Sequence, residues 1–202
     1  MNTVDNTLTD NIAGISATLT GNPTVSDNQI AFTANDTFSF DISQLNLTSS
    51  NRTFRIKFTP TTLDSNNKNV MGLGKNSSLW IDMTTAYINS TKLIIQHSNR
   101  SFTGSTTGVT AGNNSDNRLP TAPVTGQEYE LVISESTDGN VRWYIDGALV
   151  QDGTAELFNP LYISNTEGTN RFIGSYSLIE IYNEYCETYQ DFTNMINNTA
   201  TK

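Results

Sequence analysis

Residues 127–152 read QEYELVISESTDGNVRWYIDGALVQD and contain two Asp-Gly pairs, Asp138-Gly139 and Asp146-Gly147. Each pair lies between short runs in which every second residue is apolar. An Asp-Gly pair between alternating runs is the strongest short-range signal of a β-hairpin, because the central turn residues need positive φ. The segment therefore predicts three consecutive antiparallel strands and an all-β protein.

The same period of two recurs along the rest of the chain. Residues 37–42 read TFSFDI and residues 53–59 read TFRIKFT, so apolar side chains point one way while Arg55 and Lys57 point the other. Residues 171–182, RFIGSYSLIEIY, are apolar on both faces near their end, which is typical of a central strand. Further strands are predicted at residues 14–20, 29–33, 78–83, 92–97 and 161–164. Many short strands separated by turn signals favour a β-sandwich over a parallel α/β fold.

Two loops and one helix complete the prediction. Residues 64–75, DSNNKNVMGLGK, are expected to form a polar loop. Residues 98–123 are rich in Gly, Asn, Thr and Pro and are expected to form a long loop, in which a few apolar residues leave room for a short strand. A helix is predicted at about residues 188–196, because Thr188 and Asp191 resemble a capping box.

Composition limits the class of protein. The chain has 202 residues, a size that a β-sandwich reaches as one domain, so residues 1–202 are expected to form a single domain. The formal net charge of −9 argues against nucleic acid as a partner, since phosphate binding needs clustered Lys and Arg. We interpret the negative charge as serving solubility. Cys186 has no partner for an internal disulfide and is predicted to pack in the interior.

The N-terminal residues MNTVDNTLTDN have neither the basic region nor the apolar core of a signal peptide. No apolar run approaches the roughly 18 residues that a membrane span requires. We therefore expect no insertion into a membrane. The expected location is a virion or the extracellular space, reached as a mature chain or without a cleaved signal.

Three elements in order carry a resemblance to a known family. They are the strand NRTFRIKFTP at residues 51–60, the hairpin strand that ends in Tyr-x-Asp-Gly at residues 144–147, and RFIGSYSLIEIYNEY at residues 171–185 with an acidic helix after it. This order resembles the concanavalin A-like lectin/glucanase superfamily, and within it the laminin-G-like and pentraxin-like domains. The resemblance implies a jelly-roll sandwich of two antiparallel sheets with one short C-terminal helix. Members of the superfamily include lectins, glycan hydrolases and adhesion domains, some of them in virions.

The candidate sugar-binding residues lie around Trp80. A lectin site combines a flat aromatic ring with a few polar groups that bond sugar hydroxyls. Trp80 lies opposite the apolar face of its predicted strand and next to Asp82, and Asn76 is near it in sequence. Tyr87 and Asn89 are expected in a nearby turn. The alternative for Trp80 is packing beneath the long loop. Trp143 is expected in the core, because it shares a face with apolar neighbours.

Calcium is the one cofactor that the resemblance implies, because many relatives bind it in rim loops through Asp, Asn and backbone oxygens. Asp64 and Asn66 offer such oxygens, although they lack a defined ligand spacing. An ordinary solvated loop is the alternative interpretation.

An enzyme is not expected. Hydrolases of the superfamily carry three acids at alternate positions of one strand, so that two of them act as nucleophile and acid/base. The nearest match is Glu180-Ile181-Tyr182-Asn183-Glu184, in which the middle acid is a Tyr.

We therefore predict a non-catalytic lectin-like recognition module whose partner is a glycan or a virion or cell-surface protein. The first alternative is a structural virion or assembly protein that uses the sandwich for docking to other proteins. A glycan hydrolase is the third hypothesis. The oligomeric state is left open.

Overall fold

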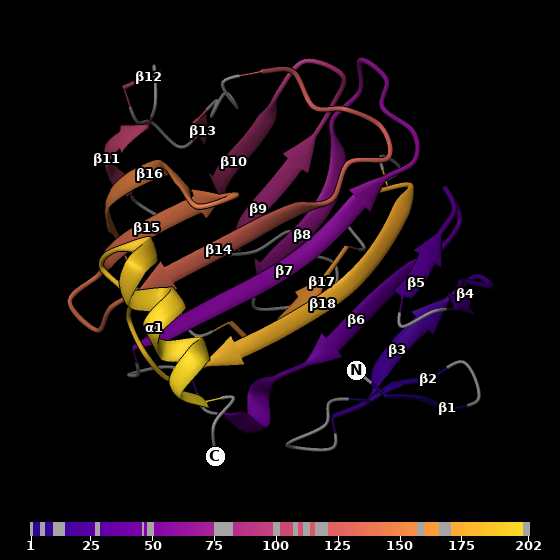
Figure 1. Cartoon of the computed structure of the whole chain (residues 1–202), viewed down its shortest axis with the longest axis horizontal. Coiled ribbons are helices and arrows are strands. Elements are labelled where there is room, and N and C mark those ends of the chain that lie inside the picture. Colours follow the sequence, from indigo (N-terminus) through magenta and orange to yellow (C-terminus); the bar gives the residue numbers. More distant parts are fainter. Residues whose placement is uncertain are drawn as a thin grey trace.

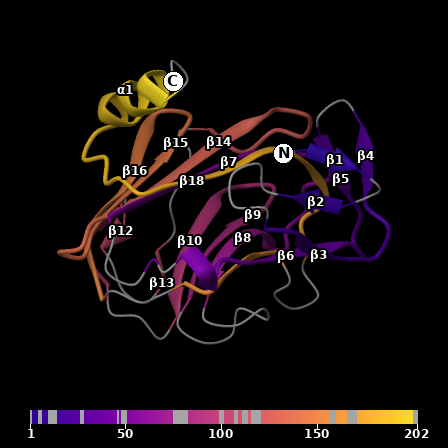
Figure 2. The same cartoon turned by 90° about the horizontal axis from the view of Figure 1, so that it is seen from below.

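A computed structural model shows two large antiparallel sheets packed face to face, with one α-helix on the outside (Figures 1 and 2). The structure describes residues 2–4, 7–9, 15–26, 29–45, 47, 51–74, 83–98, 102–106, 109–110, 114–115, 121–156, 160–165 and 171–199. Within these ranges the architecture is the all-β sandwich with a C-terminal helix that the sequence predicts. A separate two-stranded ribbon is formed by β1 (Asn2–Val4) and β2 (Thr7–Thr9).

The larger sheet has nine strands among the described residues, in the order β12-β11-β16-β15-β14-β7-β18-β5-β4. Their bounds are β4 (Thr24–Ser26), β5 (Gln29–Phe32), β7 (Arg52–Pro60), β11 (Phe102–Thr106), β12 (Val109–Thr110), β14 (Tyr129–Glu135), β15 (Asn140–Ile145), β16 (Ala148–Ala155) and β18 (Gly174–Tyr182). The strand β18 lies between β7 and β5, which confirms its predicted central position.

The smaller sheet has seven strands in the described ranges, in the order β13-β10-β9-β8-β17-β6-β3. Their bounds are β3 (Ala17–Thr20), β6 (Thr37–Asp41), β8 (Lys68–Gly74), β9 (Met83–Ile88), β10 (Leu93–Ser98), β13 (Asn114–Ser115) and β17 (Tyr162–Ser164). A short 3₁₀ helix, η1 (Ser43–Leu45), follows β6.

The twin Asp-Gly segment forms the expected run β14, β15 and β16, but its two turns differ. Asp146 and Gly147 have φ of 47° and 81°, so both residues of this two-residue turn are left-handed as predicted. In the first turn only Gly139, with φ of 84°, is left-handed. There Gly139 N donates to Ser136 O at 3.0 Å, which makes a three-residue loop with a glycine at its end. The expectation of positive φ at both residues is therefore wrong for Asp138.

The prediction of a polar loop at residues 64–75 is wrong for most of these residues. Residues 68–74 form the strand β8, in which Val70, Met71 and Leu73 are buried in the core. The glycines at positions 72 and 74, which favour a loop in isolation, alternate with Leu73 and occupy the other face of the sheet. Burial of the apolar residues outweighs the low strand propensity of glycine. Likewise, β11, β12 and β13 lie within the predicted loop at residues 98–123.

The main core lies between the two sheets. Alternation points Phe38 and Phe40 of β6 into a cluster of buried side chains that also contains Phe58, Trp143 and Tyr176 of the facing sheet. Their aromatic rings meet mainly edge to face, for example at 5.2 Å between the centroids of Phe38 and Tyr176. Each buried aromatic side chain contributes about 2–3 kcal/mol of hydrophobic stabilisation. The prediction that Trp143 is a core residue is confirmed.

A second, smaller core fixes the helix α1 (Tyr189–Thr199) to the outer face of the nine-stranded sheet (Figures 1 and 2). It contains Val132, Tyr144, Phe192 and Cys186, which confirms the packing role of the cysteine. The predicted capping box is present, since Thr188 N donates to Asp191 Oδ2 at 2.9 Å and Asp191 N donates to Thr188 Oγ1 at 3.1 Å. No helix in the described part of the chain is long and apolar enough to cross a membrane.

Candidate functional site

The outer face of the seven-stranded sheet, which points away from the larger sheet, carries small polar residues. Phe40, Ile163 and Leu73 point into the core, so their neighbours in sequence point outward. Strand register aligns four of these outward positions across adjacent strands. We call this set the polar row: Thr18 of β3, Ser39 of β6, Ser164 of β17 and Gly72 of β8.

A second set of outward positions lies two residues along the strands. Asp41 of β6 pairs with Tyr162 of β17, and Tyr162 pairs with Gly74 of β8. Residues opposite one another in antiparallel strands have Cβ atoms about 5 Å apart, so the half-buried Tyr162 ring lies beside the exposed Asp41 carboxylate. Gly74 itself has no side chain to cover the ring on that side.

Local contacts keep Asp41 ionised. The Ser43 side chain and the Ser43 backbone N–H, the latter donating to Oδ1 at 3.0 Å, hold the pKa of the Asp41 carboxyl below its usual value of 3.8. These bonds outweigh the small opposing effect of burial. At neutral pH Asp41 is therefore a fixed acceptor of hydrogen bonds.

The polar row also contains a hydroxyl whose hydrogen-bonding capacity is unused among the described residues. Ser39 is 8% exposed and its Oγ has no partner in that part of the chain, whereas Ser164 Oγ donates to Phe38 O at 2.9 Å. A buried polar group without a partner costs about 1–3 kcal/mol. On the same face, Asn69 of β8 is fully buried and both of its amide atoms lack a described partner. These atoms are buried, so the polar group that this face presents to solvent beside Tyr162 is the Asp41 carboxylate.

The sugar-binding residues predicted from the sequence fall partly on the same sheet. Trp80, Asn76 and Asp82 belong to the segment that joins β8 to β9, and they lie outside the described residues. Tyr87 is not in a turn as expected. It lies in β9, it is 9% exposed, and it pairs across the sheet with Asn69.

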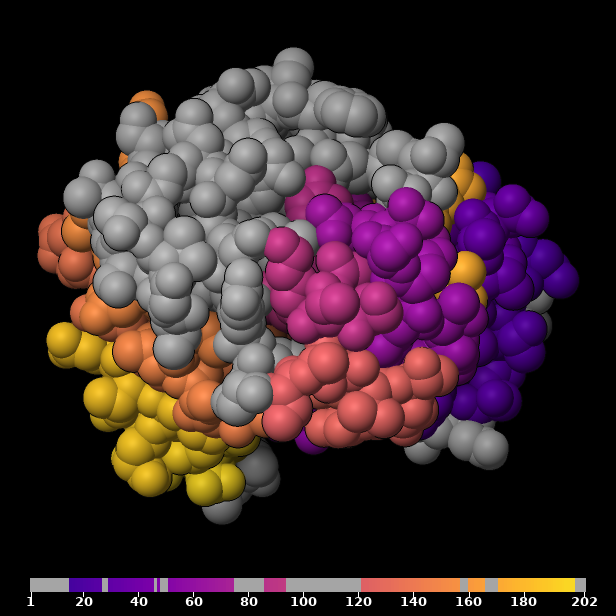
Figure 3. All heavy atoms as spheres, turned by 90° about the horizontal axis from the view of Figure 1, so that it is seen from above, coloured from indigo at the N-terminus to yellow at the C-terminus, as the bar shows by residue number. Residues whose placement is uncertain are grey.

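Asn89 does lie in a turn, between β9 and β10, and its amide is engaged there. Its Oδ1 accepts bonds from Thr91 N at 2.8 Å and Lys92 N at 3.0 Å, and its Nδ2 donates to Asn67 Oδ1 at 2.8 Å. Ser90 N donates to Asp64 O at 2.8 Å, so this turn lies beside the loop that follows β7 (Figure 3). The predicted sugar residue Asn89 and the predicted metal residue Asp64 are therefore neighbours.

The contacts of Asp64 suit an ion pair better than a calcium site. Asp64 Oδ1 accepts a bond from Asn66 N at 2.8 Å, and Oδ2 lies 3.1 Å from Lys68 Nζ. These two groups hold the pKa of Asp64 below its usual value, the bond from Asn66 first. An ammonium group in this position competes with a bound cation. In the part of the chain that the structure describes, no group of three or more His, Cys, Asp or Glu residues is placed to hold a metal ion.

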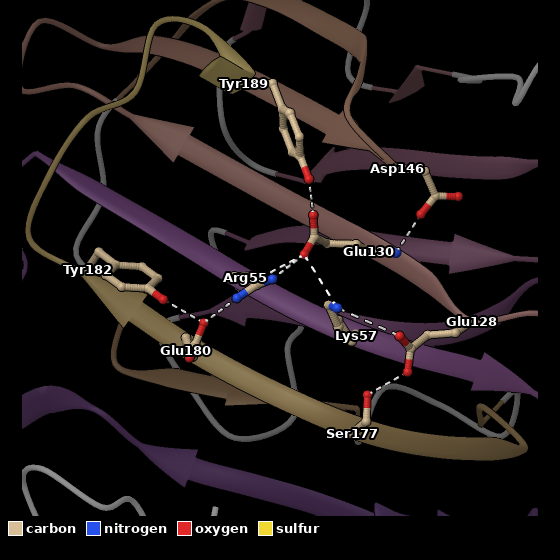
Figure 4. A network of polar contacts seen from close by, with 9 residues as sticks. All are labelled: Arg55, Lys57, Glu128, Glu130, Asp146, Ser177, Glu180, Tyr182 and Tyr189. Atoms are coloured by element: carbon tan, nitrogen blue, oxygen red, sulfur yellow. Dashed lines mark hydrogen bonds and ion pairs between the residues drawn. The ribbon is translucent and has the colours of Figure 1, made fainter. Parts of the chain in front are cut away.

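A different polar network covers the outer face of the nine-stranded sheet (Figure 4). Its centre is Arg55 of β7, which donates to Glu130 Oε1 at 2.7 Å and to Glu180 Oε2 at 3.0 Å. Burial alone would lower the pKa of Arg55, but these two carboxylates raise it. The Arg55 guanidinium also lies 5.5 Å from the ring centroid of Phe192 in α1. Tyr189 of α1 donates to Glu130, so the network joins the helix to the sheet.

The network does not form the acid triplet of a hydrolase. Tyr182 donates to Glu180 Oε2 at 2.5 Å, and Arg55 occupies the same oxygen. The strand β18 ends at Tyr182, so Glu184 lies beyond it, and strand alternation no longer places Glu184 beside Glu180. Burial first, and then the bond to Glu130, raise the pKa of Tyr189 to about 12. We interpret these groups as the contacts that hold α1 against the sheet.

Comparisons with known proteins identify the fold. No family model matches the chain, and no curated protein matches it. The structure is similar to domain 4 of AbnA, a GH43 extracellular arabinanase from Geobacillus stearothermophilus solved with arabinotriose. The two share 15% identity with a TM-score of 0.62, over 93% of this chain and 92% of that one. The fold is a concanavalin A-like jelly-roll sandwich, as the sequence resemblance implies.

Two further solved structures are larger than this chain. The binding domain of botulinum neurotoxin DC in complex with SialylT is 13% identical, with a TM-score of 0.61, over 96% of this chain. A sialidase from Trypanosoma rangeli is 11% identical, with a TM-score of 0.59, over 88% of this chain. The chain spans 49% of the toxin domain and 28% of the sialidase. At these identities the likeness establishes the fold alone.

Proposed function

We propose that the protein is a non-catalytic glycan-recognition module that binds sugar on the outer face of the seven-stranded sheet. The observation that carries the proposal is the pairing of Tyr162 with Asp41, which brings a half-buried aromatic ring and an exposed, ionised carboxylate onto neighbouring strands of one face. A ring that covers the apolar face of a sugar, next to groups that bond its hydroxyls, is the chemistry of a carbohydrate site. The fold shared with an arabinotriose-bound domain and a SialylT-bound domain supports the proposal.

The site includes, in this proposal, the sugar residues predicted around Trp80. The segment of Trp80, Asp82 and Asn76 joins two strands of the same sheet, and Tyr87 is on one of them. Trp80 and Tyr162 would then be two aromatic contacts for one extended ligand.

A glycan array with single variants tests the proposal. Loss of one ring or one carboxylate contact is expected to weaken binding about tenfold, which corresponds to about 1.4 kcal/mol. The variants are Tyr162→Ala, Asp41→Asn and Trp80→Ala. Tyr185→Ala is the control, because Tyr185 is equally half-buried but follows the end of β18 in the other sheet. Silence of the wild-type protein across the array, or equal losses in all four variants, would overturn the proposal.

The absence of catalysis is part of the proposal. Its support is the Tyr at the middle position of the acid triplet, together with the engagement of Glu180 by Arg55 and Tyr182. Incubation of the protein with the glycans that it binds is expected to release no reducing ends. Cleavage that disappears in Glu180→Gln would show a hydrolase instead.

We also propose a location on a virion or in the extracellular space, which the sequence resemblance supports. Density-gradient separation of the producing culture is expected to recover the protein with particles or in the medium. Recovery from the cell lysate alone would contradict this location.

A further inference from the structure

We propose that the glycan bound on this face is uncharged, and that acidic sugars are rejected. This inference rests on the proposed function and adds the chemical class of the ligand. It follows from the distribution of charge on the two faces of the sandwich.

In the part of the chain that the structure describes, the outward positions around Tyr162 are neutral apart from one acid. Thr18, Ser39 and Ser164 are hydroxyl residues, and Gly72 has no side chain. The charged member is Asp41, which is ionised at neutral pH and whose pKa the Ser43 hydrogen bonds lower further. A sialic acid, uronic acid or sulfate on this face would therefore meet a like charge.

Among the described basic residues, Lys92 lies in the turn between β9 and β10, at the end of the sheet where Lys68 begins β8 and Gly74 is remote. Most of the others lie on the larger sheet and form ion pairs. Arg52, Arg55 and Lys57 lie on β7 and Arg142 lies on β15, all in the larger sheet, and each forms an ion pair with a carboxylate. Lys68 is on the smaller sheet but is bound to Asp64 at 3.1 Å. An acidic sugar that recruited one of these five groups would first have to break an ion pair.

Arg171 also has partners, although its buried Nε has none among the described residues. Its Nη1 donates to Asn35 O at 2.9 Å, and its charge stabilises the Asp36 carboxylate. The net charge of −9 adds a long-range repulsion toward anions. Hydroxyl groups of a neutral sugar, in contrast, can bond the exposed Asp41 carboxylate without displacing any described ion pair.

Matched pairs of ligands test the inference. The probes are lactose, N-acetyllactosamine and arabinotriose, together with the sialylated forms of the first two and a uronic-acid trisaccharide. Whichever neutral probe binds is expected to bind at least tenfold more tightly than its acidic counterpart. Its affinity is expected to change less than twofold between 50 and 500 mM salt, because no charge pair forms, whereas binding through an anion weakens steeply with salt.

The variant Thr18→Lys places a cation on the edge strand β3, opposite Ser39. Lysine is well tolerated on an exposed edge strand. Thr18→Ala is the control. Thr18→Lys is expected to gain at least fivefold in affinity for the acidic member of the pair. Wild-type preference for the acidic members would overturn the inference while the proposed glycan function stands. If no probe and no array glycan binds, the proposed function itself fails.

Discussion

Arg52 and Glu135 show how a single pair of residues can determine whether the sandwich is stable. They lie opposite one another on β7 and β14, with 1% and 0% of their side chains exposed. Arg52 Nη2 and Nε lie 2.6 and 3.0 Å from Glu135 Oε2, and Nη1 donates to Leu47 O at 2.8 Å. Burial removes both charges from water, so each depends on the other for compensation.

Glu135→Gln is expected to lower the free energy of unfolding by about 3–5 kcal/mol, because it leaves the Arg52 charge buried and uncompensated. Urea unfolding monitored by tryptophan fluorescence measures the loss. The matched control is Asp152→Asn, which breaks the more exposed pair with Arg142 and is expected to cost about 1 kcal/mol or less. Equal effects of the two variants would contradict this prediction.

Gly147 is constrained twice, by its φ of 81° and by the Tyr189 ring of α1. A Cβ atom at this position would lie 3.1 Å from Tyr189 Cε1. Gly147→Ala is therefore expected to destabilise the protein by about 1–2 kcal/mol from the left-handed backbone, plus the cost of displacing the ring.

Gly126→Ala isolates the contribution of the backbone. Gly126 has φ of 83°, but a Cβ there meets nothing within 4 Å. Thermal unfolding of both variants gives the difference between them, which measures the contact with Tyr189. If Gly126→Ala is as damaging as Gly147→Ala, the ring contributes nothing.

Among the elements, the turns at the edge of the sandwich depend on one carboxylate. Asp36 lies between β5 and β6, where it accepts bonds from Thr33 N and from Asn22 N in the β3–β4 turn, both at 2.7 Å. Burial by itself would raise the pKa of Asp36, but these bonds, the Thr33 hydroxyl and the charge of Arg171 outweigh it and lower the pKa below 3.8. The ionised form is therefore preferred more strongly in the folded state than in the unfolded state.

This preference makes the stability depend on pH. Since the folded pKa is the lower one, the stabilisation is complete above the unfolded value of 3.8 and is lost as pH falls through the folded value. In Asp36→Asn this contribution is missing at every pH. The gap in unfolding free energy between wild type and variant, followed from pH 6 to pH 2, is expected to close on acidification. A gap that stays constant would contradict this role for Asp36.

The helix α1 depends on both local and long-range contacts. Its start follows from local sequence, since Thr188 and Asp191 form the capping box. Its position on the sheet follows from contacts between distant residues. The Phe192 ring packs against the Arg55 guanidinium, and Tyr189 donates to Glu130 (Figure 4). Those contacts could not be predicted from the sequence, because the partners are more than 50 residues apart.

For the whole molecule, net charge controls association. The formal charge is −9 at pH 7, and the sequence pI is about 4.4. Repulsion between molecules vanishes where the net charge is zero, so solubility is expected to pass through a minimum near pH 4.4. Static light scattering across pH 3–8 measures the association. A solubility minimum more than about one pH unit away from this value would show that folding shifts the pKa values of many carboxyl groups in the same direction.

Parts of the candidate site were visible in the sequence and parts were not. The outward positions of Ser39 and Asp41 follow from the alternation in TFSFDI. The sequence does not single out Tyr162 as a site residue, because three residues of strand give too little pattern to tell its two faces apart. The sequence predicts a loop in place of the strand β8, because its glycines favour a loop. The burial of Val70 and Leu73 between the two sheets, which favours the strand, is a property of the tertiary structure.

The sequence by itself determined the all-β class, the run of strands β14 to β16, the superfamily resemblance and the cap of α1. Each of these depends on residues that are close in the chain or on the period of two, which is a local property. Only the tertiary structure decided which strands are neighbours. It therefore also decided that Asp41 meets Tyr162, from 121 positions away, and that Arg52 meets Glu135. Strand register pairs residues that are distant in the chain, and no local pattern specifies the partner.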